Sequence, residues 1–162
     1  MCSSDLSSGV FTLLSTTSVD IFLVGGGGAG ACKYWSGGGG SGGVLTQTSV
    51  SLSAGSYAVI VGAGGSAPSF NLGGTSGSPS KFHFGTGATD HYVAGGGLGG
   101  RIYAGTAPEG MDTEGNILGS SGGGSTDSAP ITSGSQGNNG GPAGGSGNPQ
   151  TGGGGGGAGG VG

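Results

Sequence analysis

The chain has 162 residues, of which 49 are glycine and only 6% are charged, and its formal net charge is −4. Three basic side chains are too few to neutralise the phosphates of a nucleic acid, and no apolar run approaches the roughly 20 residues that cross a bilayer. The length fits one domain, but the low content of large aliphatic residues argues against the core of an ordinary enzyme.

Short runs of β-branched and aromatic residues predict β-strands in the first two thirds of the chain. We expect strong strands at residues 10–14, 19–24, 44–52 and 57–61, and weaker ones at 81–84, 91–94 and 101–104. A polar Ser-Thr-Thr-Ser stretch between the first two runs suits a turn. No window has the apolar period of an amphipathic helix, so we predict an all-β fold with essentially no α-helix.

The strand predicted at residues 44–52 has a regular alternation. Every second residue is expected to share one face of a half-buried strand: Val44, Thr46, Thr48, Val50 and Leu52.

Blocks of glycine follow the predicted strands repeatedly. They occupy residues 25–30, 37–43, 62–65, 95–100, 122–124 and 152–160. A flexible linker would concentrate its glycines in one place, whereas ordered polyglycine forms an extended helix with three residues per turn. When such helices are bundled, their N–H and C=O groups can pair because no side chain keeps the backbones apart. The recurrence of the blocks therefore predicts packed polyglycine-II helices beside the strands.

The change in composition near residue 118 divides the chain into parts. We expect a non-native or disordered leader at residues 1–7 and a β-rich, glycine-punctuated part at residues 8–118. Residues 119–162 are predicted to be a polyglycine-II-rich part of the same domain.

Five pieces of the sequence carry, in this order, a family resemblance. They are residues 19–30, residues 37–45, the segment Leu-Ser-Ala-Gly-Ser-Tyr-Ala-Val-Ile-Val-Gly-Ala-Gly-Gly at residues 52–65, and residues 73–84 and 94–97. The ordered set resembles the glycine-rich domain of bacteriophage tail-fibre and tail-tip proteins and of bacterial surface proteins. The glycine-rich extracellular domain of anaplastic-lymphoma-kinase-type receptors is a more distant relative. This resemblance implies a β-sandwich-like layer with polyglycine-II helices packed beside it.

Several patterns that could indicate a nucleotide-binding, metal-binding or catalytic site are better explained as ordinary turns and glycine blocks. The block at residues 25–30 follows a strand, as a dinucleotide fingerprint does, but no helix comes after it to hold a phosphate. The acidic turn at residues 112–116 resembles a calcium loop without the distal bidentate acid. His83 and His91 flank a Gly-Thr-Gly turn, and spacing supplies no third ligand. No nucleophile, acid and histidine form a recognisable set. We expect no enzyme activity, no cofactor and no metal.

Four aromatic residues are the candidate contact residues. Tyr34 and Trp35 stand between two glycine blocks, and Tyr92 and Tyr103 flank a third. Aromatic rings on loops can stack on sugar rings or anchor a protein partner. The alternative is that each ring caps the glycine bundle or covers its own strand.

These observations favour a non-enzymatic structural or adhesive module of an extracellular fibre, either a surface filament or a phage tail fibre. The alternatives are a receptor-binding tip for host glycan or outer-membrane protein, and an ice-binding protein, although irregular Ser/Thr spacing argues against the last. The expected partner is a second copy, as homo-oligomer or filament, with neither nucleic-acid binding nor membrane insertion. Two cysteines are no disulfide framework, yet a Cys2–Cys32 bridge stays open.

Overall fold

The computed structural model describes residues 7–32, 36–67, 69, 73–83, 91–94, 97, 119–123, 135–144 and 151–158, with the backbone alone at 83 and 91–94. Its strands are β1 (Gly9–Leu13), β2 (Thr17–Val24), β3 (Val44–Leu52), β4 (Gly55–Ile60), β5 (Ser80–His83) and β6 (His91–Ala94). The described residues contain no helix, and every strand pair is antiparallel, so the all-β prediction is confirmed.

The predicted strands lie close to the observed ones. The strands predicted at 44–52 and 91–94 have the observed bounds, and the others begin or end within two residues of their predicted limits. The strand predicted at residues 101–104 lies outside the described residues. Local composition is a good guide here because each run of β-branched and aromatic residues is bounded by glycine or polar residues.

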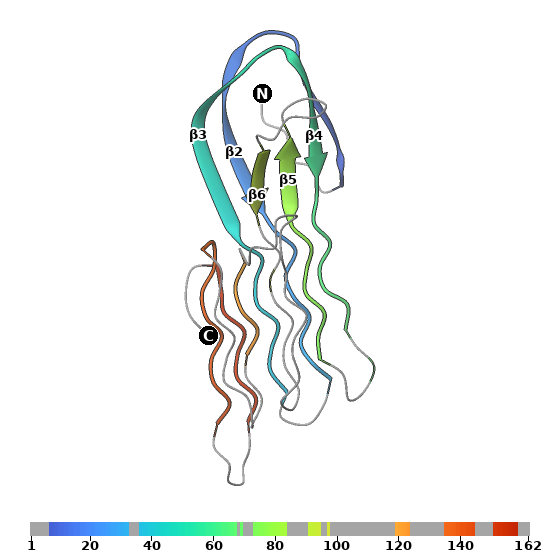
Figure 1. Ribbon diagram of the computed structural model, residues 1–162, viewed down its shortest axis with the longest axis vertical. Helices are drawn as coiled ribbons and strands as arrows, with labels where there is room; N and C mark the ends of the chain where they lie inside the picture. Colours follow the sequence, from blue (N-terminus) through green and yellow to red (C-terminus); the bar gives the residue numbers. More distant parts are fainter. Residues whose placement is uncertain are drawn as a thin grey trace.

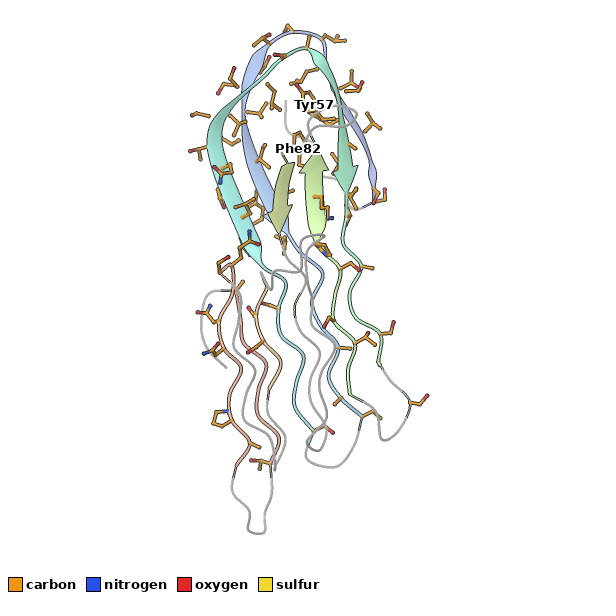
Figure 2. All side chains as sticks on the ribbon, viewed as in Figure 1. Tyr57 and Phe82 are labelled. Carbon is orange, nitrogen blue, oxygen red and sulfur yellow. The ribbon has the colours of Figure 1, made fainter. Side chains whose placement is uncertain are left out.

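Two sheets face each other across a small core. One has the order β1-β4-β5-β6, and the other consists of β2 and β3. The buried apolar residues are Ile21 and Leu52 from the smaller sheet and Tyr57 and Phe82 from the larger one. The rings of Tyr57 and Phe82 stack with their centroids 5.6 Å apart, and the Tyr57 hydroxyl donates to the carbonyl oxygen of Ser53 at 2.7 Å. Figure 2 shows both rings between the sheets.

The Ser-Thr-Thr-Ser stretch is not a hairpin turn. The chain bends at residues 14–15, and the last two residues of the stretch already belong to β2. β1 pairs with β4 and β2 pairs with β3, so the stretch carries the chain from one sheet to the other. A polar run predicts a change of direction, but strand partners are chosen by contacts far away in the sequence.

The predicted alternation along β3 is wrong, because a β-bulge interrupts it. Val19 lies opposite Val50 and Ile21 opposite Gln47, so Asp20 faces two residues of β3. One of them, Ser49, has a φ of 58°. Its N–H donates to Oδ1 of Asp20 at 2.8 Å. An extra residue reverses the faces beyond it.

The bulge therefore divides β3 into two halves of opposite phase. Before it, Leu45 and Gln47 are half-buried while Thr46 and Thr48 are exposed. After it, Val50 and Leu52 point to the core and continue the same inner face.

The strands form one end of an elongated molecule, and glycine segments form the other. Figure 1 shows the two sheets above a set of extended segments that run side by side, away from the strand ends. Figure 2 shows side chains gathered around the sheets and sparse along these segments.

Candidate functional site: a bundle of glycine segments

The glycine segments pair through backbone hydrogen bonds that recur at every third residue. Residues 25–31 continue from β2, residues 37–43 lead into β3, and the two segments run antiparallel. The N–H groups of Gly25, Gly28 and Ala31 donate to the carbonyl oxygens of Gly43, Gly40 and Gly37 at 3.0, 2.8 and 3.1 Å. A repeat of three residues is the period of a polyproline II helix.

A third and a fourth segment bond to other edges of residues 25–31. The N–H groups of Gly26 and Ala29 donate to Ser78 and Thr75 at 2.9 Å each, again three residues apart. On another edge, Gly27 accepts from the N–H of Gly65 at 2.8 Å. Gly26 also accepts from the N–H of Gly97 at 2.8 Å. This one segment therefore bonds to four neighbours, which a two-sided β-strand cannot do.

The hydrogen bonds arrange the segments in two rows. Row one contains residues 61–67, 25–31, 37–43 and 151–158, and row two contains residues 73–79, Gly97, 119–123 and 135–144. The segments after residue 118 bond to those before it through pairs such as Gly123 with Gly38 at 2.8 Å and Ser41 with Gly156 at 2.9 Å. The bundle thus joins pieces of chain more than 100 residues apart in sequence.

Most glycines between the rows are required by close packing. A Cβ built on Gly40 would overlap the carbonyl oxygens of Ser120 and Ser121, and one on Gly74 would overlap the carbonyl of Ala29. Real Cβ atoms do not come so close to backbone, so any other residue would push the segments apart and break their hydrogen bonds. Glycine is therefore the residue that permits this bundle.

Two buried serines hold the centre of row two. Residues 119–123 are buried throughout, and Ser120 and Ser121 are both 0% exposed. The Ser120 hydroxyl accepts from the N–H of Asn138 at 3.2 Å and lies 3.0 Å from the Ser41 hydroxyl. It also donates to the carbonyl oxygen of Gly157 at 3.1 Å.

The second hydroxyl serves the neighbouring segment of the same row. The Ser121 hydroxyl accepts from the N–H of Gly140 at 2.7 Å. Asn138 adds a bond from its own side-chain amide to Gly157 at 2.8 Å. The two serines therefore supply hydrogen-bond partners for three segments that glycine alone could not satisfy.

The sequence does not single out these serines. They stand in a Gly-Ser-Ser-Gly-Gly-Gly stretch that resembles several other serine-containing glycine stretches of the chain. The sequence marks them only as a pair of small polar residues inside a glycine block. Which block lies at the centre of the bundle depends on how all the blocks pack together.

The far end of the bundle carries chain reversals. The hydrogen bond from Ala31 to Gly37 is the last described bond of that pair of segments, so Cys32 and Ser36 lie at the end remote from β2 and β3 (Figure 1). Gly144 and Thr151 pair in the same way and close the segments of residues 135–144 and 151–158.

Most of the predicted contact residues lie outside the described residues. This holds for Tyr34, Trp35 and Tyr103. Tyr92 belongs to β6, where its backbone lies opposite that of Phe82.

The candidate metal-ligating residues are placed as follows. His83 and His91 lie opposite one another in the β5–β6 pair, and the acidic turn at residues 112–116 is outside the described part. Among the residues that the structure describes, no group of three His, Cys, Asp or Glu side chains could share a metal ion. Cys32 is exposed with a free thiol, and Cys2 is not among the described residues.

The described residues include no helix that is long and apolar enough to cross a membrane. Comparison with known proteins gives one match. A family model described as a glycine-rich domain matches residues 6–162. No curated protein and no solved structure matches the chain.

Proposed function

Because this chain belongs to the glycine-rich domain family, we propose that it is a non-enzymatic structural and adhesive module of an extracellular fibre. The observation that carries this proposal is the two-row bundle, whose backbone hydrogen bonds tie together segments from the whole length of the chain. A bundle held together by backbone hydrogen bonds is a stiff spacer with few side chains. Stiffness suits a fibre, because a fibre must keep its shape between the particle or cell that carries it and the surface that it reaches.

The distribution of charge also supports a structural role. None of the described residues in the bundle segments is Asp, Glu, Lys or Arg. Catalytic sites use titratable groups with perturbed pKa values, and the described bundle offers no cluster of them. The resemblance to phage tail-fibre and bacterial surface proteins makes a virion or a cell-surface appendage the proposed location.

A receptor-binding tip is the second candidate function. The observation in its favour is that Cys32 and Ser36 lie at the far end of the bundle, since Tyr34 and Trp35 stand between them in the sequence. Host glycan or an outer-membrane protein is the proposed ligand, because aromatic rings serve both kinds of contact.

Electron microscopy of the native material tests the proposal that the protein belongs to a fibre. Negative staining with gold-labelled antibody against the bundle should place the protein along or at the end of a filament or tail. Label confined to the cell interior, with no filamentous structure decorated, would refute the proposal.

Substitution of Trp35 tests the proposal of a receptor-binding tip. Trp35→Ala should weaken binding to a glycan array or to purified outer-membrane protein by about 2 kcal/mol or more and leave thermal stability nearly unchanged. Phe22→Ala is the matched control, because that ring is 66% exposed and belongs to β2, which lies in the sheet half of the molecule (Figure 1). A large loss of stability with unaltered affinity would show instead that Trp35 caps the bundle.

A further inference from the structure

Asparagine followed directly by glycine occurs once in the chain, at Asn139 and Gly140, and aspartate followed by glycine does not occur. Asparagine is chemically labile, and it is most labile before glycine, because glycine has no Cβ to hinder the approach of its own backbone nitrogen. Asn139 is exposed, whereas Gly140 is buried in row two of the bundle. The fold therefore places a reactive pair within its packed glycine segments.

The reaction open to this pair is deamidation, which needs no enzyme. The backbone nitrogen of Gly140 gives up its proton and attacks Cγ of the Asn139 side chain. A C–N bond forms, the bond from Cγ to the amide nitrogen breaks, and ammonia leaves with the proton, so that a succinimide ring remains. Water then opens the ring at either carbonyl and gives aspartate or isoaspartate. Water is consumed and ammonia is released with no change of oxidation state.

The Ser121 hydroxyl holds the nitrogen that would have to attack. The N–H of Gly140 donates to Oγ of Ser121 at 2.7 Å, and both residues are buried. Attack requires this nitrogen to lose its proton and to turn toward Asn139, and both steps break the hydrogen bond. A buried hydroxyl that loses its partner is costly, so the bond opposes the reaction.

Close backbone packing holds the same peptide group in place. A Cβ built on Gly156 would lie 2.8 Å from the carbonyl carbon of Asn139, and one built on Gly140 would lie 2.7 Å from that of Gly122. Real Cβ atoms do not come so close to backbone, so these segments leave no room for the peptide to turn. A peptide group turns as a rigid plane, and the ring can therefore form only when residues 135–144 leave the bundle.

We propose that Asn139 and Gly140 form a latent deamidation site, which Ser121 keeps unreactive while the bundle is closed. The site reacts when residues 135–144 separate from their neighbours. This chemistry does not depend on what the protein binds or where it acts, so it stands apart from the fibre proposal.

The product hinders the return of the segment to the bundle. Isoaspartate adds a carbon to the backbone, which shifts the repeat of three residues just before Gly141, whose N–H donates to the carbonyl oxygen of Gly154 at 2.7 Å. Both products also add a negative charge, and the described bundle residues carry none. Each reacted opening is therefore retained as a lasting chemical change.

Peptide mapping by mass spectrometry, after incubation of the full chain in mildly alkaline buffer, measures the conversion of Asn139. The folded wild-type chain should convert more slowly than the same chain in urea, by about tenfold or more, because a closed segment is protected. Ser121→Ala should raise the rate in the folded chain by about tenfold, since it removes the acceptor of the Gly140 N–H.

Ser80→Ala is the matched control. The Ser80 hydroxyl is also buried and also accepts from a glycine N–H, that of Gly62 at 2.9 Å. The variant therefore removes the same kind of hydrogen bond from a different segment, and it should leave the conversion of Asn139 unchanged while the chain stays folded.

A folded wild-type chain that converts as fast as the chain in urea would overturn the proposal, and this comparison decides even if Ser121→Ala does not fold. A folded Ser121→Ala chain with the wild-type rate would also overturn it. Equal acceleration by Ser121→Ala and Ser80→Ala would do the same, because overall stability, and not the bond to Gly140, would then control the reaction.

Discussion

At the scale of single residues, the hydroxyls of Ser120 and Ser121 decide how segments without side chains are held together. A buried polar group is tolerated when its hydrogen bonds are made and costly when they are not. Ser120 satisfies the N–H of Asn138 and the carbonyl of Gly157 at once. Tyr57 has a comparable place in the sandwich, where its ring fills the core and its hydroxyl reaches Ser53.

Ser120→Ala should lower the free energy of unfolding by about 1–3 kcal/mol, because it leaves buried partners without a hydrogen bond. The volume change is small, so lost packing contributes little. Urea denaturation followed by tyrosine fluorescence measures the change. Ser56→Ala is the control: its hydroxyl pairs with Thr12 in an exposed position, and a change within about 0.5 kcal/mol is expected. Equal effects of the two variants would show that Ser120 is not a structural centre.

At the scale of elements, glycine segments and strands follow different rules. A strand is specified by its side chains, and its partner can be replaced by another strand with a suitable face. A glycine segment is specified by the absence of side chains, and its neighbours surround it. Position within the bundle therefore decides whether a given glycine can be substituted.

Gly40→Ala should destabilise the protein severely, by about 3 kcal/mol or more, since its Cβ would overlap backbone of the central segment. Gly27→Ala is the matched change in the neighbouring segment. Its Cβ has ordinary contacts, so it should be neutral or stabilise by about 0.4–1 kcal/mol in the dilute monomer. Thermal denaturation at low concentration compares the two, and a similar loss from both would contradict the two-row arrangement.

The bulge in β3 gives a second prediction for an element. Ser49 has a φ of 58°, which is unfavourable for a residue with a Cβ. Ser49→Gly should therefore stabilise the protein by about 0.5–1 kcal/mol. Ser51→Gly, in the same strand beyond the bulge, is the control and should destabilise it by about the same amount. Stabilisation by both, or by neither, in urea denaturation would argue against a strained Ser49.

At the scale of the whole molecule, the sandwich and the bundle are built from alternating pieces of one chain. β2 and β4 continue directly into the glycine segments 25–31 and 61–67, which run away from the sheets, and segments 37–43 and 73–79 lead the chain back into β3 and β5 (Figure 1). The pairing of β2 with β3 continues directly into the pairing of residues 25–31 with 37–43. The pairing of β2 with β3 therefore sets the register in the sandwich and also in the glycine bundle.

Amide hydrogen exchange should show order in the last third of the chain. The N–H groups of Ser121, Gly123 and Gly156 donate to backbone carbonyls at 3.1, 2.8 and 2.9 Å. Buried and bonded amides exchange slowly, so these three should be protected well beyond the rates of the same chain in urea. Exchange at random-coil rates would mean that the bundle is not formed and that these residues act as a linker.

The class of the fold and the positions of the strands could be predicted from the sequence, because β-branched and aromatic runs bounded by glycine carry a local signal. The same holds for the glycine bundle, since repeated glycine blocks leave few other ordered structures. The predicted contacts at Tyr34, Trp35, Tyr92 and Tyr103 stay predictions.

Strand partners, the reversal of phase at Ser49, the two rows and the central place of Ser120 and Ser121 were decided by tertiary structure. The physical reason is that glycine segments are locally alike. Without side chains, one block does not differ from another in what it can pair with. Its neighbours are settled by where the strands at its ends are held, and by which arrangement satisfies the most backbone hydrogen bonds at once.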